Sequence, residues 1–136
     1  MRRAILALAI LVLALAGCGA QIPGWLPANI TEAREAHKPL VLFFYATWCH
    51  SCRAFQADVL TDPRVVTALT RVKFVEYNGG TKAGLDALQR CRGRNVPLLV
   101  AIDGEGTIRL RGDGAERNAE AFLEFLGEAE RVIGHH

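Results

Sequence analysis

Two cysteines spaced for a disulfide, Cys49 and Cys52, directly follow the apolar run of residues 40–46. On a helix, residues three apart lie on one face with side chains roughly 5–6 Å apart, which is within reach of a disulfide. An apolar run of this length is typical of a buried strand, so the pair is placed where a strand gives way to a helix. This arrangement predicts a redox disulfide between Cys49 and Cys52 that exchanges with protein thiols and disulfides.

The two sulfurs are expected to have different roles in that exchange. Cys49 falls at the helix N-terminus, where unpaired backbone N–H groups and the positive end of the helix dipole favour a thiolate over a thiol. It is therefore the expected attacking sulfur. Cys52 lies one turn further along and is expected to resolve the mixed disulfide that Cys49 forms with a substrate.

A metal site is the alternative use of such a pair. A zinc site normally has four ligands, and Cys91, His37, His135 and His136 offer no second paired spacing. Haem attachment requires a histidine directly after the second cysteine, where this chain has Arg53. We therefore expect no metal and no cofactor. Copper(I) accepts two thiolates, so a module that binds or delivers copper is kept as a second hypothesis.

The N-terminus has the pattern of an export signal. Arg2 and Arg3 precede an apolar run over residues 4–16, which is too short to cross a bilayer because roughly 20 residues are needed. Residues 15–18 resemble a bacterial lipobox, which implies that residues 1–17 are removed and that Cys18 carries the lipid, palmitate included. Ordinary signal cleavage after Ala16 is the alternative, because residues 14–16 also fit the small-residue rule.

Charge and export together limit the partners and the location. The chain has 16 Lys and Arg against 14 Asp and Glu, and removal of residues 1–17 takes two arginines away, which leaves no basic excess for nucleic acid. Export places the protein in the bacterial envelope, on the periplasmic side, where disulfides persist. Gly19 stands where an aspartate would retain a lipoprotein at the inner membrane, which slightly favours the outer membrane.

The chain divides into the signal, a lipid anchor with a Pro- and Gly-containing linker over residues 18–28, and one domain over residues 29–136. The domain is expected to be α/β, with a central mixed sheet flanked by helices. Asn29 or Thr31 is the expected cap of the first helix, and Leu85 and Leu88 are expected to face inward. The expected strands are residues 40–46, 72–77, 98–102 and 107–111, and the expected helices are residues 29–37, 49–60, 64–70, 82–92 and 116–132.

This order resembles the thioredoxin superfamily over residues 29–133. Trp48 and the cysteine pair follow the first buried strand, and Pro97 opens a later strand before a Gly-containing hairpin and a terminal helix. Lys38-Pro39, Tyr45-Ala46 and Asp62-Pro63 are most similar to the periplasmic C-terminal domain of the disulfide reductase that carries electrons across the bacterial inner membrane.

The resemblance implies a thioredoxin-like fold and further members of the site. Pro97 is expected to be cis and to face Cys49, and the backbone of Val96 is expected to pair with substrate. Trp48 is expected beside the sulfurs, although a core aromatic is an alternative for it, and His50 and Ser51 lie between the cysteines. The resemblance favours reduction of protein disulfides, with an integral-membrane electron donor as a partner, while two carboxylates that the family has and this chain lacks leave oxidation or isomerisation open.

Two positions depart from the family. Phe43 stands six residues before Cys49, where a buried carboxylate is usual, and Gln56 stands seven residues after it, where the reductase domain has an acid. A nearby carboxylate raises the pKa of a thiol, so its loss predicts a pair more oxidising than thioredoxin at roughly −270 mV. A protonated His50 acts in the same direction, unless it is simply a solvated residue.

Cys91 lies between Arg90 and Arg92. A single cysteine of this kind is usually a small buried hydrophobe. The alternatives are a third redox thiol whose pKa is lowered by the arginines, or a site of disulfide-linked dimerisation.

Overall fold

The computed structural model describes residues 27–134, so the predicted signal, Cys18 and most of the predicted linker lie outside the described residues. The strands are β1 (Leu40–Tyr45), β2 (Lys73–Asn78), β3 (Leu98–Ile102) and β4 (Ile108–Arg111). The helices are α2 (Pro27–Glu35), α3 (His50–Ala54), the π-helical η2 (Phe55–Val59), α4 (Pro63–Leu69), α5 (Lys82–Arg90) and α6 (Ala119–Ile133).

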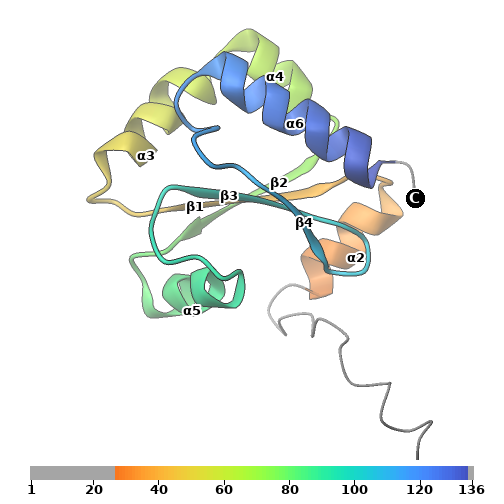
Figure 1. Ribbon diagram of the computed structural model, residues 1–136, viewed down its shortest axis with the longest axis horizontal. Helices are drawn as coiled ribbons and strands as arrows, with labels where there is room; N and C mark the ends of the chain where they lie inside the picture. The colour runs from red at the N-terminus through yellow and green to blue at the C-terminus, as the bar shows by residue number, and fades with distance from the viewer. Residues whose placement is uncertain (1–26, 135–136) are drawn as a thin grey trace, which may run out of the picture.

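The strands form one mixed sheet in the order β2-β1-β3-β4. Strand β1 pairs parallel with β2 and antiparallel with β3, and β3 pairs antiparallel with β4. Helices α3, α4 and α6 cover one face of the sheet, and α2 and α5 cover the other (Figure 1). The predicted α/β class with a central mixed sheet is confirmed.

The central position of β1 in the sheet explains why its sequence is apolar throughout. Because successive side chains point to opposite faces, Val41 and Phe43 enter the core under α3 and α6, whereas Leu40, Leu42 and Phe44 enter the core over α2 and α5. Each of these five side chains has no exposed surface. A central strand with both faces covered has no position for a polar side chain.

The helix after the cysteine pair was predicted as one piece, and it consists of α3 continued by η2. Within η2 the backbone N–H of Leu60 donates to the carbonyl of Phe55 at 3.0 Å, which is the wider turn of a π-helix. Helix α4 then begins as predicted, with Pro63 in its first turn after the cap Asp62.

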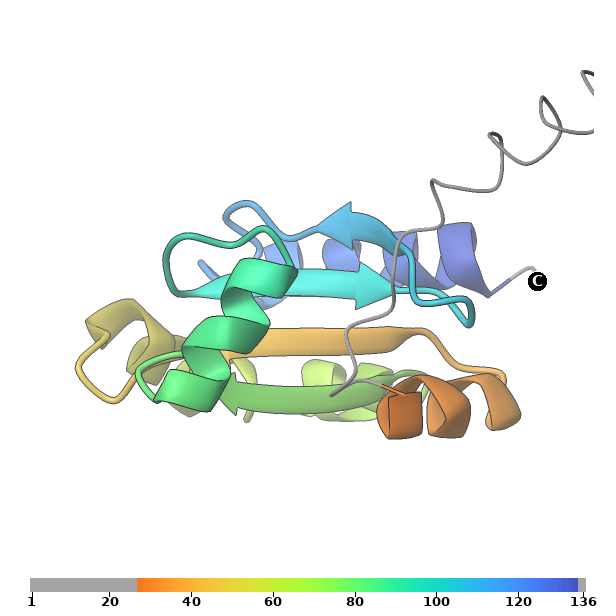
Figure 2. The same cartoon turned by 90° about the horizontal axis from the view of Figure 1, so that it is seen from below.

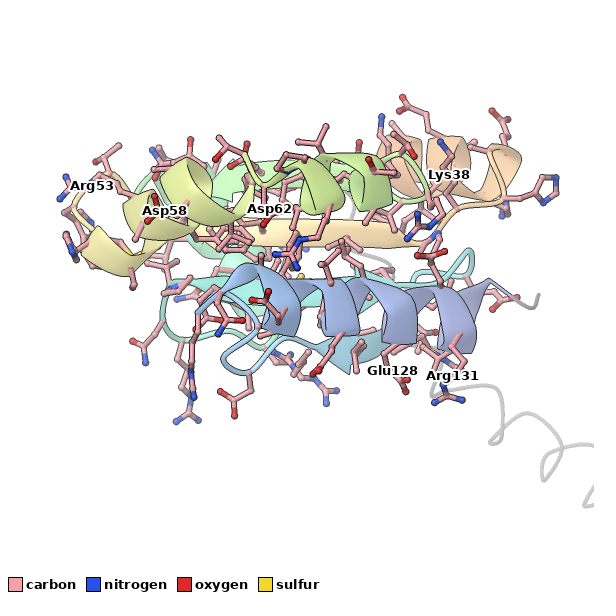
Figure 3. All side chains as sticks on the ribbon, turned by 90° about the horizontal axis from the view of Figure 1, so that it is seen from above. Lys38, Arg53, Asp58, Asp62, Glu128 and Arg131 are labelled. Atoms are coloured by element: carbon pink, nitrogen blue, oxygen red, sulfur yellow. A yellow bond between two sulfur atoms is a disulfide. The ribbon has the colours of Figure 1, made fainter. Side chains whose placement is uncertain are left out.

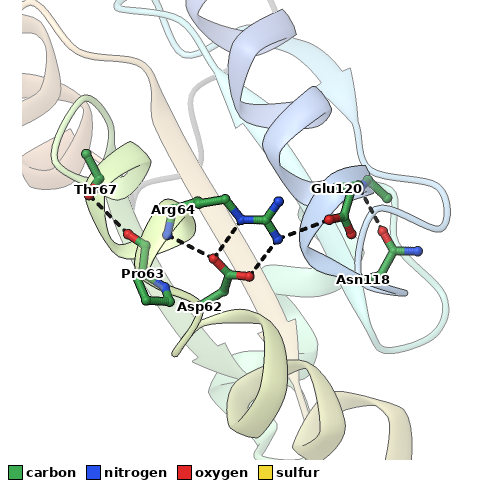
Figure 4. Close-up of polar contacts among 7 residues, drawn as sticks. Asp62, Pro63, Arg64, Thr67, Asn118 and Glu120 are labelled. Atoms are coloured by element: carbon green, nitrogen blue, oxygen red, sulfur yellow. Dashed lines mark hydrogen bonds and ion pairs between the residues drawn. The ribbon is translucent and has the colours of Figure 1, made fainter.

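The starts of α4 and α6 are tied together by charge. The Asp62 carboxylate accepts from the backbone N–H of Arg64 at 2.8 Å, and the Arg64 guanidinium donates to Asp62 and to Glu120 (Figure 4). The bond from the Arg64 side chain is the main cause that lowers the pKa of Asp62 to about 2. The carboxylate is therefore ionised under all ordinary conditions.

The predicted cap of the first helix was wrong. Helix α2 begins at Pro27, which suits a first helical position, so Asn29 and Thr31 lie inside it. The Asn29 amide instead donates to the Tyr77 hydroxyl at 3.0 Å and joins α2 to β2. The helix therefore begins two residues before the predicted domain start.

The predicted inward face of α5 is right for Leu88 and wrong for Leu85, and the predicted start of α6 also needs correction. Leu85 is 44% exposed, while Gly84, Ala87, Leu88 and Cys91 face the sheet at helical spacing. Residue 85 lies one step off this stripe. Helix α6 begins at Ala119 after its cap Asn118, three residues past the predicted start at residue 116, and Phe125 is among its buried residues.

Candidate active site

The cysteine pair lies where β1 ends and α3 begins, and it is closed as a disulfide with the two Cα atoms 5.3 Å apart. The chain turns after β1, and the backbone N–H of Cys49 donates to the carbonyl of Ala46 at 3.1 Å. Cys49 is then the N-cap of α3, and its Sγ accepts from the backbone N–H of Cys52 at 3.2 Å. The backbone therefore directs an N–H group at Cys49, as a thiolate at that sulfur requires.

Cys49, the predicted attacking residue, is slightly more exposed than Cys52, the predicted resolving residue. Cys49 is 5% exposed and Cys52 is fully buried. The Ser51 hydroxyl oxygen lies 3.6 Å from the Cys49 sulfur, and the His50 side chain faces solvent. Cys49 is therefore the sulfur that a substrate can approach, and Cys52 lies behind it.

Trp48 is 72% exposed, which rules out the core-aromatic alternative. A large aromatic side chain in water beside a disulfide adds apolar area that a docking protein can cover. Its indole lies near the turn after β2, since a Cβ atom on Gly80 would be 3.6 Å from the indole nitrogen.

The Val96-Pro97 peptide bond is cis, as the resemblance implies. Val96 reaches the same turn, because a Cβ atom on Gly79 would lie 3.1 Å from its Cγ1. The missing side chains of Gly79 and Gly80 thus let Val96 and Trp48 approach the turn from two sides. In the sequence these glycines indicate only a turn, and nothing local shows what packs on them. The expected contact of Pro97 with the Cys49 sulfur and the pairing of Val96 with substrate stay predictions.

Phe43 and Gln56, the two positions that depart from the family, each make a defined contact in the structure. Phe43 is fully buried, with its ring centroid 4.5 Å from that of Phe55, so the place of the usual carboxylate is filled by aromatic packing. The Gln56 amide donates to the Glu76 carboxylate at 2.8 Å, and Glu76 is the β2 partner of Phe43. An exposed carboxylate therefore lies one strand away from the position where the sequence lacks one.

Cys91 is 1% exposed and belongs to the core over α2 and α5, on the other face of the sheet from the disulfide. Burial raises the pKa of its thiol to about 11, and the nearby Arg111 guanidinium lowers it only in part. The expectation that Arg90 and Arg92 would acidify this thiol has no support. Cys91 has the environment of a small buried hydrophobe.

Within residues 27–134, no three histidine, cysteine or acidic side chains are grouped so that they could hold a metal ion. Nothing in this part of the chain favours the copper-binding alternative. None of its helices is long and apolar enough to span a bilayer.

Comparison with known proteins agrees with this site. A thioredoxin-like family model matches residues 21–104, which is more than half of the chain. The chain belongs to the thioredoxin-like family. Among solved structures, the oxidised C-terminal domain of DsbD from Neisseria meningitidis is similar to this domain, with a TM-score of 0.60 and 25% identity over 76% of this chain and 92% of that domain.

Curated relatives carry the same resemblance. Thiol:disulfide interchange protein DsbD 1 of Pseudomonas aeruginosa is 41% identical over 56 residues, which is 41% of this chain and 10% of that protein. DsbD of Ralstonia nicotianae is 34% identical over 104 residues, which is 74% of this chain and 17% of that protein. The chain therefore spans at most about a sixth of these relatives. With its Cys49-Cys52 pair, this thioredoxin-like chain carries a thiol-disulfide oxidoreductase domain.

Proposed function

We propose that the protein reduces protein disulfides in the bacterial envelope, tethered to a membrane by lipid on Cys18. The observation that carries the proposal is the Cys49-Cys52 disulfide at the start of α3, with Cys49 5% exposed and Cys52 fully buried. The exposed Trp48, next to Cys49 in the chain, supplies apolar surface for a protein substrate.

The reduction uses both thiols of the reduced pair. The Cys49 thiolate attacks one sulfur of a substrate disulfide, forms a mixed disulfide and releases the other substrate sulfur as a thiolate, which takes a proton from water. The Cys52 thiol gives its proton to water and attacks the Cys49 sulfur as a thiolate, which releases the second substrate sulfur as a thiolate that takes a proton from water. Two electrons pass from the pair to the substrate, and Cys49 and Cys52 end as a disulfide.

The next cycle needs an electron donor that returns two electrons to the pair. An integral-membrane dithiol protein is proposed for this role, because the chain resembles a domain of the reductase that carries electrons across the bacterial inner membrane. Residues 18–28 form the proposed anchor and linker, and roughly ten residues of linker reach at most about 35 Å. Residues 1–17 are the proposed signal, and Gly19 is the reason to favour the outer membrane. Metabolic labelling with palmitate tests the anchor, and Cys18→Ser should abolish the label and release the protein from membranes.

The reduction potential of the pair is proposed to lie above that of thioredoxin, which is roughly −270 mV. The support is the aromatic packing around Phe43, which leaves no carboxylate at that buried position to raise the pKa of the thiols. Equilibration with glutathione buffers measures the potential. A value at or below that of thioredoxin would contradict the proposal.

Trapping of substrates tests the function itself. With Cys52→Ser the resolving step is lost, so mixed disulfides on Cys49 should accumulate and can be identified by mass spectrometry. The matched control is Cys91→Ser, which should trap nothing because Cys91 is buried on the other face of the sheet. Reduction of insulin should be lost with Cys49→Ser, and activity that survives this change would refute the exchange mechanism.

A further inference from the structure

The charged side chains are paired differently at the two ends of the sheet. At the end away from the disulfide, four ion pairs neutralise most of the charge: Lys73 with Glu32, Arg71 with Glu130, Arg131 with Glu128, and Arg109 with Asp103. Figure 3 shows Glu128, Arg131 and Lys38 at this end and Arg53 at the other.

The disulfide end carries four exposed cations, Arg53, Lys82, Arg92 and Arg94, which we name the basic rim. Within residues 27–134, none of the four forms an ion pair. Arg53 follows Cys52 directly and donates to the carbonyl of Thr47 at 3.2 Å. This cation is thus fixed over the turn that carries Trp48 and Cys49.

The other three rim cations come from the two segments that border Trp48 and Val96. Lys82 opens α5 directly after the Gly79-Gly80 turn, and Arg92 and Arg94 lie in the loop that leads from α5 to the cis bond before Pro97. Figure 2 shows this loop and the turn after β2 at the same end of the sheet as the start of α3. The rim therefore borders the reactive sulfur and the exposed indole.

Acidic residues at this end do not cancel the rim. Asp86 on α5 is taken up by an ion pair with Arg90 at 2.7 Å. The loop between β4 and α6 carries Asp113 and Glu116 together with a further cation, Arg117. Asp58 on η2 and Glu76 on β2 are further exposed acids toward this end, so the positive excess is concentrated on Lys82, Arg92 and Arg94, which lie on α5 and in the loop before Pro97.

We propose that the disulfide substrates are proteins with acidic side chains around the reactive cysteine, and that the basic rim recognises these acids. The inference rests on the proposed function and names its substrate class. Unpaired exposed cations around a reactive atom raise the local concentration of an oppositely charged partner and orient it before contact, whereas Arg34 and Lys38, cations of the other end that are unpaired within the described residues, lie far from the sulfurs. Trp48, the exposed neighbour of Cys49 in the chain, then supplies apolar contact.

Three synthetic peptides of one sequence, each closed by a single disulfide, test the inference. Their flanking positions are all glutamate, all glutamine or all lysine. The protein is reduced beforehand with dithiothreitol, the dithiothreitol is removed, and the rate constant of peptide reduction is measured by stopped flow at low and at high salt. At low salt the glutamate peptide should react roughly tenfold or more faster than the lysine peptide, and salt should reduce this ratio because it screens charge.

Variants with equal changes in net charge locate the effect. Lys82→Glu with Arg94→Glu should reverse the preference, and Lys82→Gln with Arg94→Gln should greatly reduce it. The matched control is Arg34→Glu with Lys38→Glu, two exposed cations of the other end that also lack ion pairs within the described residues, and it should keep the wild-type ratio.

The outcomes separate this inference from the proposed function. If the glutamine peptide is reduced but the glutamate and lysine peptides react at equal rates, the rim does not select acidic substrates and the exchange activity stands. A ratio that changes equally in the rim and control variants also overturns the inference, because net charge alone would then explain it. If none of the peptides is reduced, both proposals fail.

Discussion

Gly84 lets α5 lie against the end of β2, and Gly84→Ala, which adds one methyl group there, tests how close the two elements are. A Cβ atom at residue 84 would overlap the carbonyl oxygen of Asn78 and lie 2.5 Å from the carbonyl carbon, about 1 Å inside ordinary carbon contact. Both contacting atoms belong to the backbone, so no side chain can rotate away. Overpacking of this kind costs about 1–3 kcal/mol and occasionally more.

Gly127 provides the matched control, because it lies in the middle of α6 and a Cβ atom there would meet nothing within 4 Å. Gly127→Ala should therefore raise the free energy of unfolding by about 1 kcal/mol through helix propensity alone. Gly84→Ala gains less of this benefit in the first turn of α5 and suffers the backbone overlap. The two variants should differ by about 2–3 kcal/mol, with Gly84→Ala the less stable.

Urea denaturation of the oxidised protein measures both variants, and an unchanged m-value keeps the comparison valid. Because α5 leads into the loop before Pro97, Gly84→Ala should also slow insulin reduction, whereas Gly127→Ala should not. If Gly84→Ala is as stable as Gly127→Ala, α5 does not lie against β2 as closely as described, and the account of the Gly79-Gly80 turn fails with it.

Three further changes have defined outcomes. The pKa of the Cys91 thiol is about 11 in the folded chain and 9.0 ordinarily. Between pH 9 and pH 11 the unfolded chain therefore loses this proton while the folded chain keeps it. The free energy of unfolding should fall by roughly 2–3 kcal/mol as the pH rises through this range. In Cys91→Ala this part of the pH dependence, followed by urea denaturation, should be absent. Asn118→Ala removes the oxygen that accepts from the Ala121 N–H at 2.8 Å and should cost about 1 kcal/mol in thermal or urea denaturation. Gln56→Glu places a second carboxylate beside Glu76, and glutathione equilibration should show a lower reduction potential, because added negative charge disfavours the thiolate of the reduced pair.

Local patterns predicted most of the fold. Residues 98–102 form a strand with the predicted bounds, and the Asp62-Pro63 signal marks the start of α4. The predicted cap at Asn29 was wrong because α2 begins two residues earlier, at Pro27, and the Asn29 amide donates to Tyr77, a partner 48 residues away that no local pattern reveals. Leu85 was placed inward on hydrophobicity alone, whereas the close approach of Gly84 to Asn78 sets which face of α5 meets the sheet.

In the candidate site, too, local features were predicted and features that depend on distant contacts were not. The cysteine spacing and the strand before it predicted the disulfide and the cap position of Cys49. The bond between Gln56 and Glu76 depends on the pairing of β1 with β2, and the basic rim depends on which cations find partners. Both follow from contacts between residues far apart in the sequence, so a reading of motifs could not find them.

The alternation of side chains along β1 also separates the two kinds of thiol in this domain. Phe43 points to the face that holds Cys49 and Cys52, and its neighbours Leu42 and Phe44 point to the face that holds Cys91. A disulfide requires Cα atoms within about 7 Å, and here a layer of fully buried strand residues lies between the pair and Cys91. Cys91 therefore cannot resolve a mixed disulfide on Cys49 unless the sheet opens. Within the folded domain that step falls to Cys52 alone, which is why Cys52→Ser should trap substrates even though a third thiol is present.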